Sequence, residues 1–274
     1  MEGAGWSRAE LLALLDWYRS IGVDALVAET AEDRLAPRSS APASVAAEPP
    51  RGWPPPLPDR VEERPAPAFV AAPPDETERL ARAAASTCAT LDELRTALAA
   101  FEGCNLRFTA TNLVFADGTP GSRVMFVGEA PGRDEDIQGI PFVGRAGQLL
   151  DQMLKAIGLD RTRVYIANVV PWRPPGNRTP TPQETAACRP FITRQIELAD
   201  PDFLVCLGNA AMRELFGTAD GILKSRGKWR PYDTGTRTIR AMAMLHPAYL
   251  LRQPLHKRLS WRDLQSLKAA LDGR

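Results

Sequence analysis

Hydrophobic residues between positions 123 and 246 alternate between two patterns. Four short apolar runs have the length and composition of buried strands, and they span residues 123–128, 163–170, 202–208 and 238–245. Between them, apolar residues recur at helical spacing over 145–157, 182–198 and 209–216. Strands that alternate with helices predict an α/β fold, a three-layer αβα sandwich around a central four-stranded parallel sheet.

The chain before residue 123 follows a different pattern. Helical spacing predicts a short amphipathic helix over 7–21 and another helix over about 75–100. The stretch between them is rich in Pro, Ala, Arg and Glu, a composition that cannot form a packed core. We therefore expect an N-terminal helical segment (1–34), a disordered linker (35–75) and one globular domain (76–274). The first helix is either a loosely docked element or a binding site for a protein partner.

Composition and charge narrow the possible functions. The 274 residues carry a formal net charge of +1, so any contact with nucleic acid must come from local placement of charge. No stretch has the length of uninterrupted apolar sequence that a membrane span requires. The four cysteines are widely spaced and include no CxxC pair, which is typical of a reducing compartment. We expect a cytoplasmic monomer without a membrane partner.

Glycine and polar residues follow every predicted strand. Glu129 comes directly after the first strand, Asn168 lies at the end of the second, Asn209 follows the third, and His246 follows the fourth. Because the carboxyl ends of parallel strands meet at one edge of a sheet, these residues are expected to line one crevice. Phe142 lies between Pro141 and the Val-Gly pair ahead of a helix. It is placed either to stack on a flat ligand or to pack in the core.

Four motifs occur in order along the chain: GEAPGRDEDIQGIPFVGRAGQLLD, NVVPWRPPGNRTPTPQE, CLGNAAMRELFG and LHPAYLLRQP. Together they resemble the family 4 (type 4) uracil-DNA glycosylases of the uracil-DNA glycosylase superfamily, from about Cys104 to Pro254. The resemblance implies an enzyme that hydrolyses the N-glycosidic bond of uracil in DNA to start base excision repair, without lyase activity. The partner that it implies is DNA containing uracil.

The resemblance also implies roles for individual residues. It assigns catalysis to His246, Glu129 and Glu135, and contact with the flipped base to Ala130, Phe142 and Asn168. His246 is expected to donate to uracil O2 as the bond breaks, and the Asn168 amide to read the pyrimidine edge. One of the two glutamates would polarise water and the other would shape the pocket, and the sequence leaves this assignment open.

Loops near these residues are expected to contact DNA. The candidates are Arg145, Asn177, Arg178, Tyr249, Leu250, Leu251 and Arg252. The Leu250–Leu251 pair is expected to be exposed and to form a wedge that enters the duplex, while the arginines would bind phosphates. The alternative is that these residues form an ordinary solvated surface.

The chain departs from family 4 at the positions that hold a four-iron, four-sulfur cluster. Cys104 and Cys188 match two of the four ligands, but Phe101 and Trp172 replace the other two. We therefore expect no cluster, no other metal and no cofactor, with apolar side chains filling the space. Two other functions remain open: a non-catalytic DNA-binding protein of the same fold, associated with replication or repair, and a nucleotide or metal-phosphate site.

Overall fold

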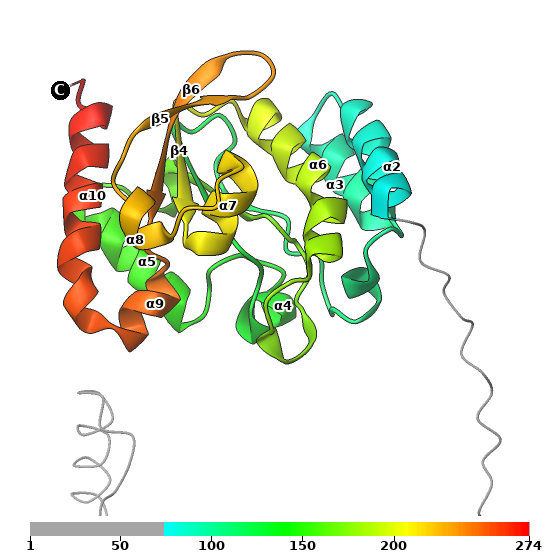
Figure 1. Ribbon diagram of the computed structural model, residues 1–274, viewed down its shortest axis with the longest axis horizontal. Coiled ribbons are helices and arrows are strands. Elements are labelled where there is room, and N and C mark those ends of the chain that lie inside the picture. Colours follow the sequence, from blue (N-terminus) through cyan, green and yellow to red (C-terminus); the bar gives the residue numbers. More distant parts are fainter. Residues whose placement is uncertain (1–73, 274) are drawn as a thin grey trace, which may run out of the picture. The chain divides into compact units, whose positions relative to one another are not determined.

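The computed structural model describes residues 74–273, and Figure 1 shows how their helices surround one sheet. The predicted N-terminal helix, and nearly all of the predicted linker over 35–75, lie outside the described residues. No helix within residues 74–273 combines the length and the apolar character needed to cross a lipid bilayer.

The sheet has six strands in the order β1-β3-β2-β4-β6-β5. Its parallel centre consists of β3 (Tyr165–Asn168), β2 (Val124–Gly128), β4 (Phe203–Leu207) and β6 (Thr238–Met244). These are the four strands that the sequence predicts. Two antiparallel strands at the edges were not predicted, β1 (Asp117–Gly118) and β5 (Arg230–Asp233). Strand β1 has only two residues, and β5 alternates half-buried and exposed positions, so neither gives an apolar run.

Helices cover both faces of the sheet. The α-helices are α2 (Pro74–Ser86), α3 (Leu91–Ala100), α4 (Arg133–Gln138), α5 (Arg145–Ala156), α6 (Pro182–Ala199), α7 (Asn209–Phe216), α8 (Ile222–Ser225), α9 (Pro247–Arg252) and α10 (Lys257–Leu271). Short 3-10 turns are η1 (Asn105–Phe108), η2 (Arg161–Arg163), η3 (Pro175–Asn177) and η4 (Pro254–His256).

The single helix predicted over 75–100 is wrong, because α2 and α3 are separate helices. Thr90 begins the second one as its N-cap, and its hydroxyl accepts a hydrogen bond from the Glu93 backbone N–H at 3.2 Å. The Glu93 carboxylate accepts in return from the backbone N–H groups of Ala89 and Thr90. This reciprocal capping box satisfies N–H groups that a continuous helix would bond to carbonyls, and it starts a new helix there.

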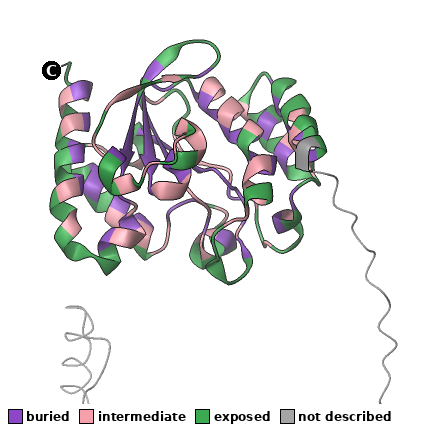
Figure 2. Cartoon of the chain, in the orientation of Figure 1, coloured by how far each residue is buried: buried purple, intermediate pink, exposed green. Residues whose placement is uncertain are grey.

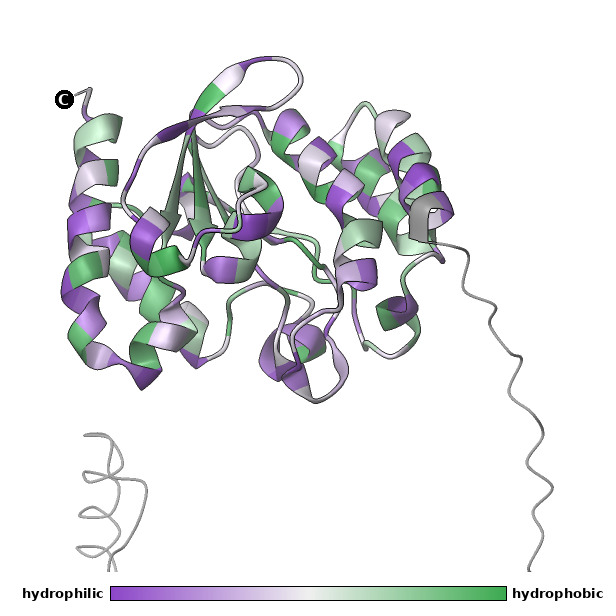
Figure 3. Ribbon diagram, in the orientation of Figure 1, coloured by the Kyte–Doolittle hydropathy of each residue, from purple (hydrophilic) through white to green (hydrophobic). Residues whose placement is uncertain are grey.

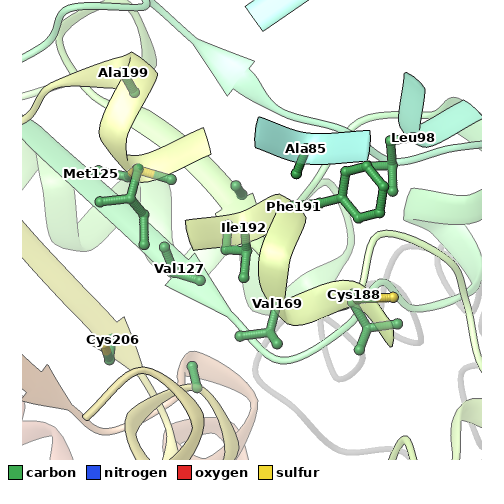
Figure 4. Packing of buried hydrophobic residues seen from close by; sticks show 14 of the residues in the cluster. Ala85, Leu98, Met125, Val127, Val169, Cys188, Phe191, Ile192, Ala199 and Cys206 are labelled. Atoms are coloured by element: carbon green, nitrogen blue, oxygen red, sulfur yellow. The ribbon is translucent and has the colours of Figure 1, made fainter. Parts of the chain in front are cut away.

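Successive side chains of each central strand enter two different cores, which makes the fold a three-layer αβα sandwich. On one face, Met125 and Val127 of β2 pack with Ile192 of α6, as Figure 4 shows. On the other face, Phe126 packs with the layer that includes Leu264 of α10. The central strands are mostly buried and hydrophobic, while the outer faces of the helices are exposed and polar (Figures 2 and 3).

Candidate active site

A cavity of about 730 Å³ lies at the carboxyl ends of the parallel strands. All four central strands contribute to its lining through the residues that follow or end them, including Glu129, Asn168, Asn209 and His246. The convergence predicted from the sequence is therefore confirmed. Strand pairing brings two of the motifs together directly, since Gly128 of β2 is the register partner of Asn168 in β3.

Phe142 forms one wall of the cavity. Its backbone is left-handed, with a φ of 56°, and its side chain is only 5% exposed. The ring stacks on the His246 imidazole, with 5.5 Å between ring centroids and 30° between the planes. Phe142 belongs to the hydrophobic core and also lines the cavity, so packing in the core does not exclude a role in stacking on a ligand.

Two neighbours that the sequence analysis did not single out hold the Phe142 backbone in place. A Cβ atom at Gly147 would lie 1.6 Å from the Phe142 carbonyl oxygen, so only glycine allows α5 to approach this closely. The Arg161 guanidinium donates hydrogen bonds to the carbonyl oxygens of Pro141 and Phe142. Arg161 lies nineteen residues from Phe142 along the chain, so no local sequence pattern indicates their hydrogen bond. For the close approach of α5 to the Phe142 backbone, the glycine at position 147 was the one available sequence signal.

Asn168 offers a hydrogen-bond acceptor to the cavity. Its side chain is 4% exposed, and its Oδ1 atom has no hydrogen-bond partner among the described residues. A Cβ atom at Gly128 would lie 2.4 Å from this oxygen, so the glycine makes room for the amide. A buried acceptor without a partner is destabilising by roughly 1–3 kcal/mol. A ligand that presents an N–H group to this oxygen would remove that cost.

His246 is held in one protonation state. Its Nδ1 atom accepts a hydrogen bond from the Ala248 backbone N–H at 3.1 Å, so the ring is the N-cap of α9. The neutral ring must then carry its proton on Nε2. Burial, with a smaller contribution from the positive charge of Arg252, lowers the pKa of His246 to about 4. At neutral pH the residue is therefore an uncharged donor through Nε2.

The two candidate glutamates have different environments. The Glu135 carboxylate accepts from the backbone N–H groups of Gly132 at 3.1 Å, Val143 at 3.0 Å and Gly144 at 2.9 Å. It thus ties the first motif loop to the segment that carries Phe142. The Glu129 carboxylate is bonded by the Thr179 hydroxyl, and burial raises its pKa. Of the two, Glu129 has the carboxylate that is not committed to backbone amides.

The residues expected to contact DNA occupy different positions. Asn177, Arg178, Tyr249 and Arg252 line the cavity together with Ala130, whereas Arg145 does not. Arg145 is exposed at the first residue of α5.

The expectation of an exposed leucine pair is wrong for Leu250. That side chain is 1% exposed and packs in the core beneath α9, because adjacent residues of a helix face different directions. Leu251 is 37% exposed and remains available as a wedge.

The cysteine positions do not fit an iron–sulfur cluster. Cys104 and Cys188 are both 1% exposed, and their thiols are hydrogen-bonded to each other, a contact that raises the pKa of Cys188 and lowers that of Cys104. Trp172 is buried in the same core, and Phe101 packs against it with its ring 5.1 Å from that of Phe191. Among residues 74–273, no group of three or more His, Cys, Asp or Glu side chains could hold a metal ion.

Comparison with known proteins gives a consistent result. Residues 115–265 match the uracil DNA glycosylase superfamily. Over 169 residues the chain is 41% identical to the type-4 uracil-DNA glycosylase of Archaeoglobus fulgidus, a match that covers 60% of this chain and 85% of that protein. It is 43% identical over 169 residues to the Thermotoga maritima protein of the same name, covering 61% and 86%. A third relative of that name, from Sulfurisphaera tokodaii, is 38% identical over 184 residues, covering 65% and 84%.

Proposed function

The chain belongs to the uracil-DNA glycosylase superfamily and, within it, to the type-4 enzymes, and on that premise we propose that it hydrolyses the N-glycosidic bond of uracil in DNA. It is a monofunctional DNA glycosylase, and its product is an abasic site that starts base excision repair. The main support for uracil as the base is the Asn168 Oδ1 atom, a buried acceptor in the cavity without a hydrogen-bond partner among the described residues.

The Asn168 amide supports the selection of uracil over cytosine. Uracil carries a hydrogen on N3, which the partnerless Oδ1 can accept, whereas cytosine N3 is itself an acceptor. Two acceptors facing each other in a buried site leave both without a donor, and such a mismatch costs roughly 1–3 kcal/mol for each group. Phe142 supplies the flat apolar surface on which the base stacks.

His246 acts on the leaving group. When the glycosidic bond breaks, negative charge develops on the uracil O2 atom. A neutral imidazole that donates through Nε2 stabilises this charge without being a charged group that must first be desolvated. The fixed tautomer keeps the donor in place before the reaction starts.

Glu129 polarises the attacking water in this mechanism. Its pKa is raised by burial, which makes the carboxylate a better base, and the Thr179 hydroxyl orients it. Glu135 instead acts as a positioning residue, because its oxygens are bonded to three backbone amides around Phe142. This division of roles is our proposal for the two glutamates, whose assignment the sequence left open.

The surroundings of the site support further parts of the proposal. DNA is bound by the cavity-lining residues Asn177, Tyr249 and Arg252 and by the exposed Leu251, with Arg145 contacting a phosphate outside the cavity. The enzyme works in the cytoplasm as a monomer and without a cluster, with aromatic side chains packed where the missing ligands would lie. For the helix predicted over 7–21, which lies outside the described residues, the two alternatives are a loosely docked element and a binding site for a protein partner.

Cleavage of oligonucleotides tests the proposed function. Matched strands with a single uracil, thymine or cytosine are incubated with the protein and then treated with alkali to break abasic sites. We expect scission at uracil alone, and Asn168→Ala should reduce it by at least tenfold while the thermal unfolding midpoint stays near that of the wild type. DNA binding without scission would refute the proposal and favour the non-catalytic alternative.

A further inference from the structure

Asn177 stands at the rim of the cavity and is held there by Arg173. The Arg173 Nε atom donates a hydrogen bond of 2.7 Å to the Asn177 Oδ1 atom. Asn177 also lines the cavity and has a left-handed backbone, with a φ of 55° at the end of η3. The contact therefore fixes a polar side chain next to the site where substrate binds.

This hydrogen bond determines which end of the amide faces the substrate. A guanidinium group has only donors, so the atom that it contacts must be the amide oxygen. The amide nitrogen Nδ2 then faces away from Arg173, and it has no hydrogen-bond partner among the described residues. Asn177 can therefore offer the cavity a donor through Nδ2, while one lone pair of its Oδ1 atom is occupied by Arg173.

Arg173 is itself anchored in the fold. Its Nη1 atom lies 3.9 Å from the Oδ2 atom of Asp136, whose side chain is 3% exposed. The Asp136 Oδ1 atom accepts from the backbone N–H groups of Thr111 at 2.8 Å and Asn112 at 3.1 Å. A chain of polar contacts thus runs from a buried carboxylate through Arg173 to Asn177.

The neighbouring Arg178 does not supply the same donor. Its guanidinium forms two hydrogen bonds with the Glu184 carboxylate, at 2.8 and 2.6 Å, and a third with the Thr179 carbonyl oxygen at 3.1 Å. The pairing with Glu184 balances the charge of Arg178, and these bonds occupy three of its five N–H donors. Asn177, by contrast, offers an uncharged donor that no carboxylate occupies.

We propose that Arg173 is a positioning residue that fixes the amide of Asn177 so that Nδ2 donates to an oxygen at the mouth of the cavity. The proposal rests on the function proposed above, which supplies two such oxygens. One belongs to a phosphodiester that flanks the uracil nucleotide, and the other is the attacking water.

A double-mutant cycle on the complete chain tests the coupling. Arg173→Met removes the donor and keeps a long side chain, and Asn177→Ala removes the amide. Each should lower kcat/KM for uracil release about tenfold, and the double variant should be no slower than Asn177→Ala alone. Arg173→Lys, which retains a donor, should recover part of the activity. Effects that multiply in the double variant, or full activity of Arg173→Met, would overturn the proposal.

Further measurements separate the two oxygens and the underlying function. If the variants raise KM, and this rise disappears when the flanking phosphate is replaced by a neutral methylphosphonate, the oxygen belongs to the phosphodiester. If they instead lower the single-turnover rate constant, the oxygen is that of the attacking water. If the wild-type protein releases no uracil, the proposed function fails, and the positioning is then read from the Asn177 side-chain amide signals in NMR spectra. Those signals should shift in Arg173→Met, and unchanged signals would contradict the proposed contact.

Discussion

A single methyl group added at Gly147 should disable the site from outside the cavity. The Cβ atom of Gly147→Ala would lie 1.6 Å from the Phe142 carbonyl oxygen, whereas real Cβ contacts stay above 3.0 Å. The helix α5 and the Phe142 backbone must therefore separate by at least 1.4 Å. Misplacement by about 1 Å can lower a rate by roughly 100-fold, which is equivalent to about 2.7 kcal/mol of transition-state stabilisation.

Helix propensity predicts the opposite sign for this substitution. Gly147 lies within α5, where alanine is favoured over glycine by about 1 kcal/mol. If propensity dominated, the variant would be at least as stable and as active as the wild type. The steric argument therefore makes a distinct prediction, namely a loss of about 100-fold in kcat/KM for uracil release.

The assay measures kcat/KM for uracil release together with the thermal unfolding midpoint. Gly221→Ala is the matched control, because a Cβ atom at Gly221 would meet nothing within 4 Å and its φ is −77°. The control should retain wild-type kcat/KM. A Gly147→Ala enzyme within twofold of the wild type would refute the reasoning, since it would mean that the Phe142 segment can move without affecting catalysis.

Four further predictions concern the site and its surroundings. His246→Ala should lower kcat by roughly 100- to 1,000-fold in single-turnover assays, as expected for loss of a donor to a developing anion. Because the pKa of His246 is lowered to about 4, the ring stays neutral above pH 5, so the acidic limb of the rate profile should report Glu129. Activity should rise with pH as the Glu129 carboxyl loses its proton, and a limb unchanged in Glu129→Gln would contradict this role. Leu251→Ala should slow cleavage of duplex substrate more than single-stranded substrate, and equal effects would argue against a wedge. The purified protein should contain no stoichiometric iron by elemental analysis, whereas replacing Phe101 and Trp172 with cysteine would restore the four family ligands for reconstitution.

The sequence predicted the centre of the fold because each central strand is an uninterrupted apolar run. The edge strand β5 was missed since its side chains alternate between half-buried and exposed positions. The break between α2 and α3 was missed because apolar spacing continues across it, although the Thr90–Glu93 capping box was present in the sequence. The pattern of hydrophobic residues thus predicted the layers of the fold more accurately than the ends of the helices.

The same limit applies to the candidate site. Asn168 lies near the end of a predicted strand and His246 follows another, so topology placed both at the cavity. The contributions of Gly147, Arg161 and Arg173 depend on which backbone or side chain lies opposite each of them, and spacing along the chain does not contain that information. Exposure of Leu250 was wrong for a related reason, since the motif does not say which side of α9 faces the core.

The hydrogen bond between Ala248 and His246 makes the short helix α9 responsible for both the tautomer of the imidazole and the position of residues at the cavity rim. The six residues of α9 begin at the His246 cap and also include Tyr249, Leu251 and Arg252 at or near the cavity rim. A change that loosens the first turn of α9 would break the hydrogen bond to Nδ1 and allow the imidazole to exchange its tautomer. A ligand that stabilises the helix would restrict that exchange. We therefore expect occupancy of the rim and the tautomer of the imidazole to be thermodynamically linked. Hydrogen–deuterium exchange at the Ala248 amide, which donates this hydrogen bond, would report both at once.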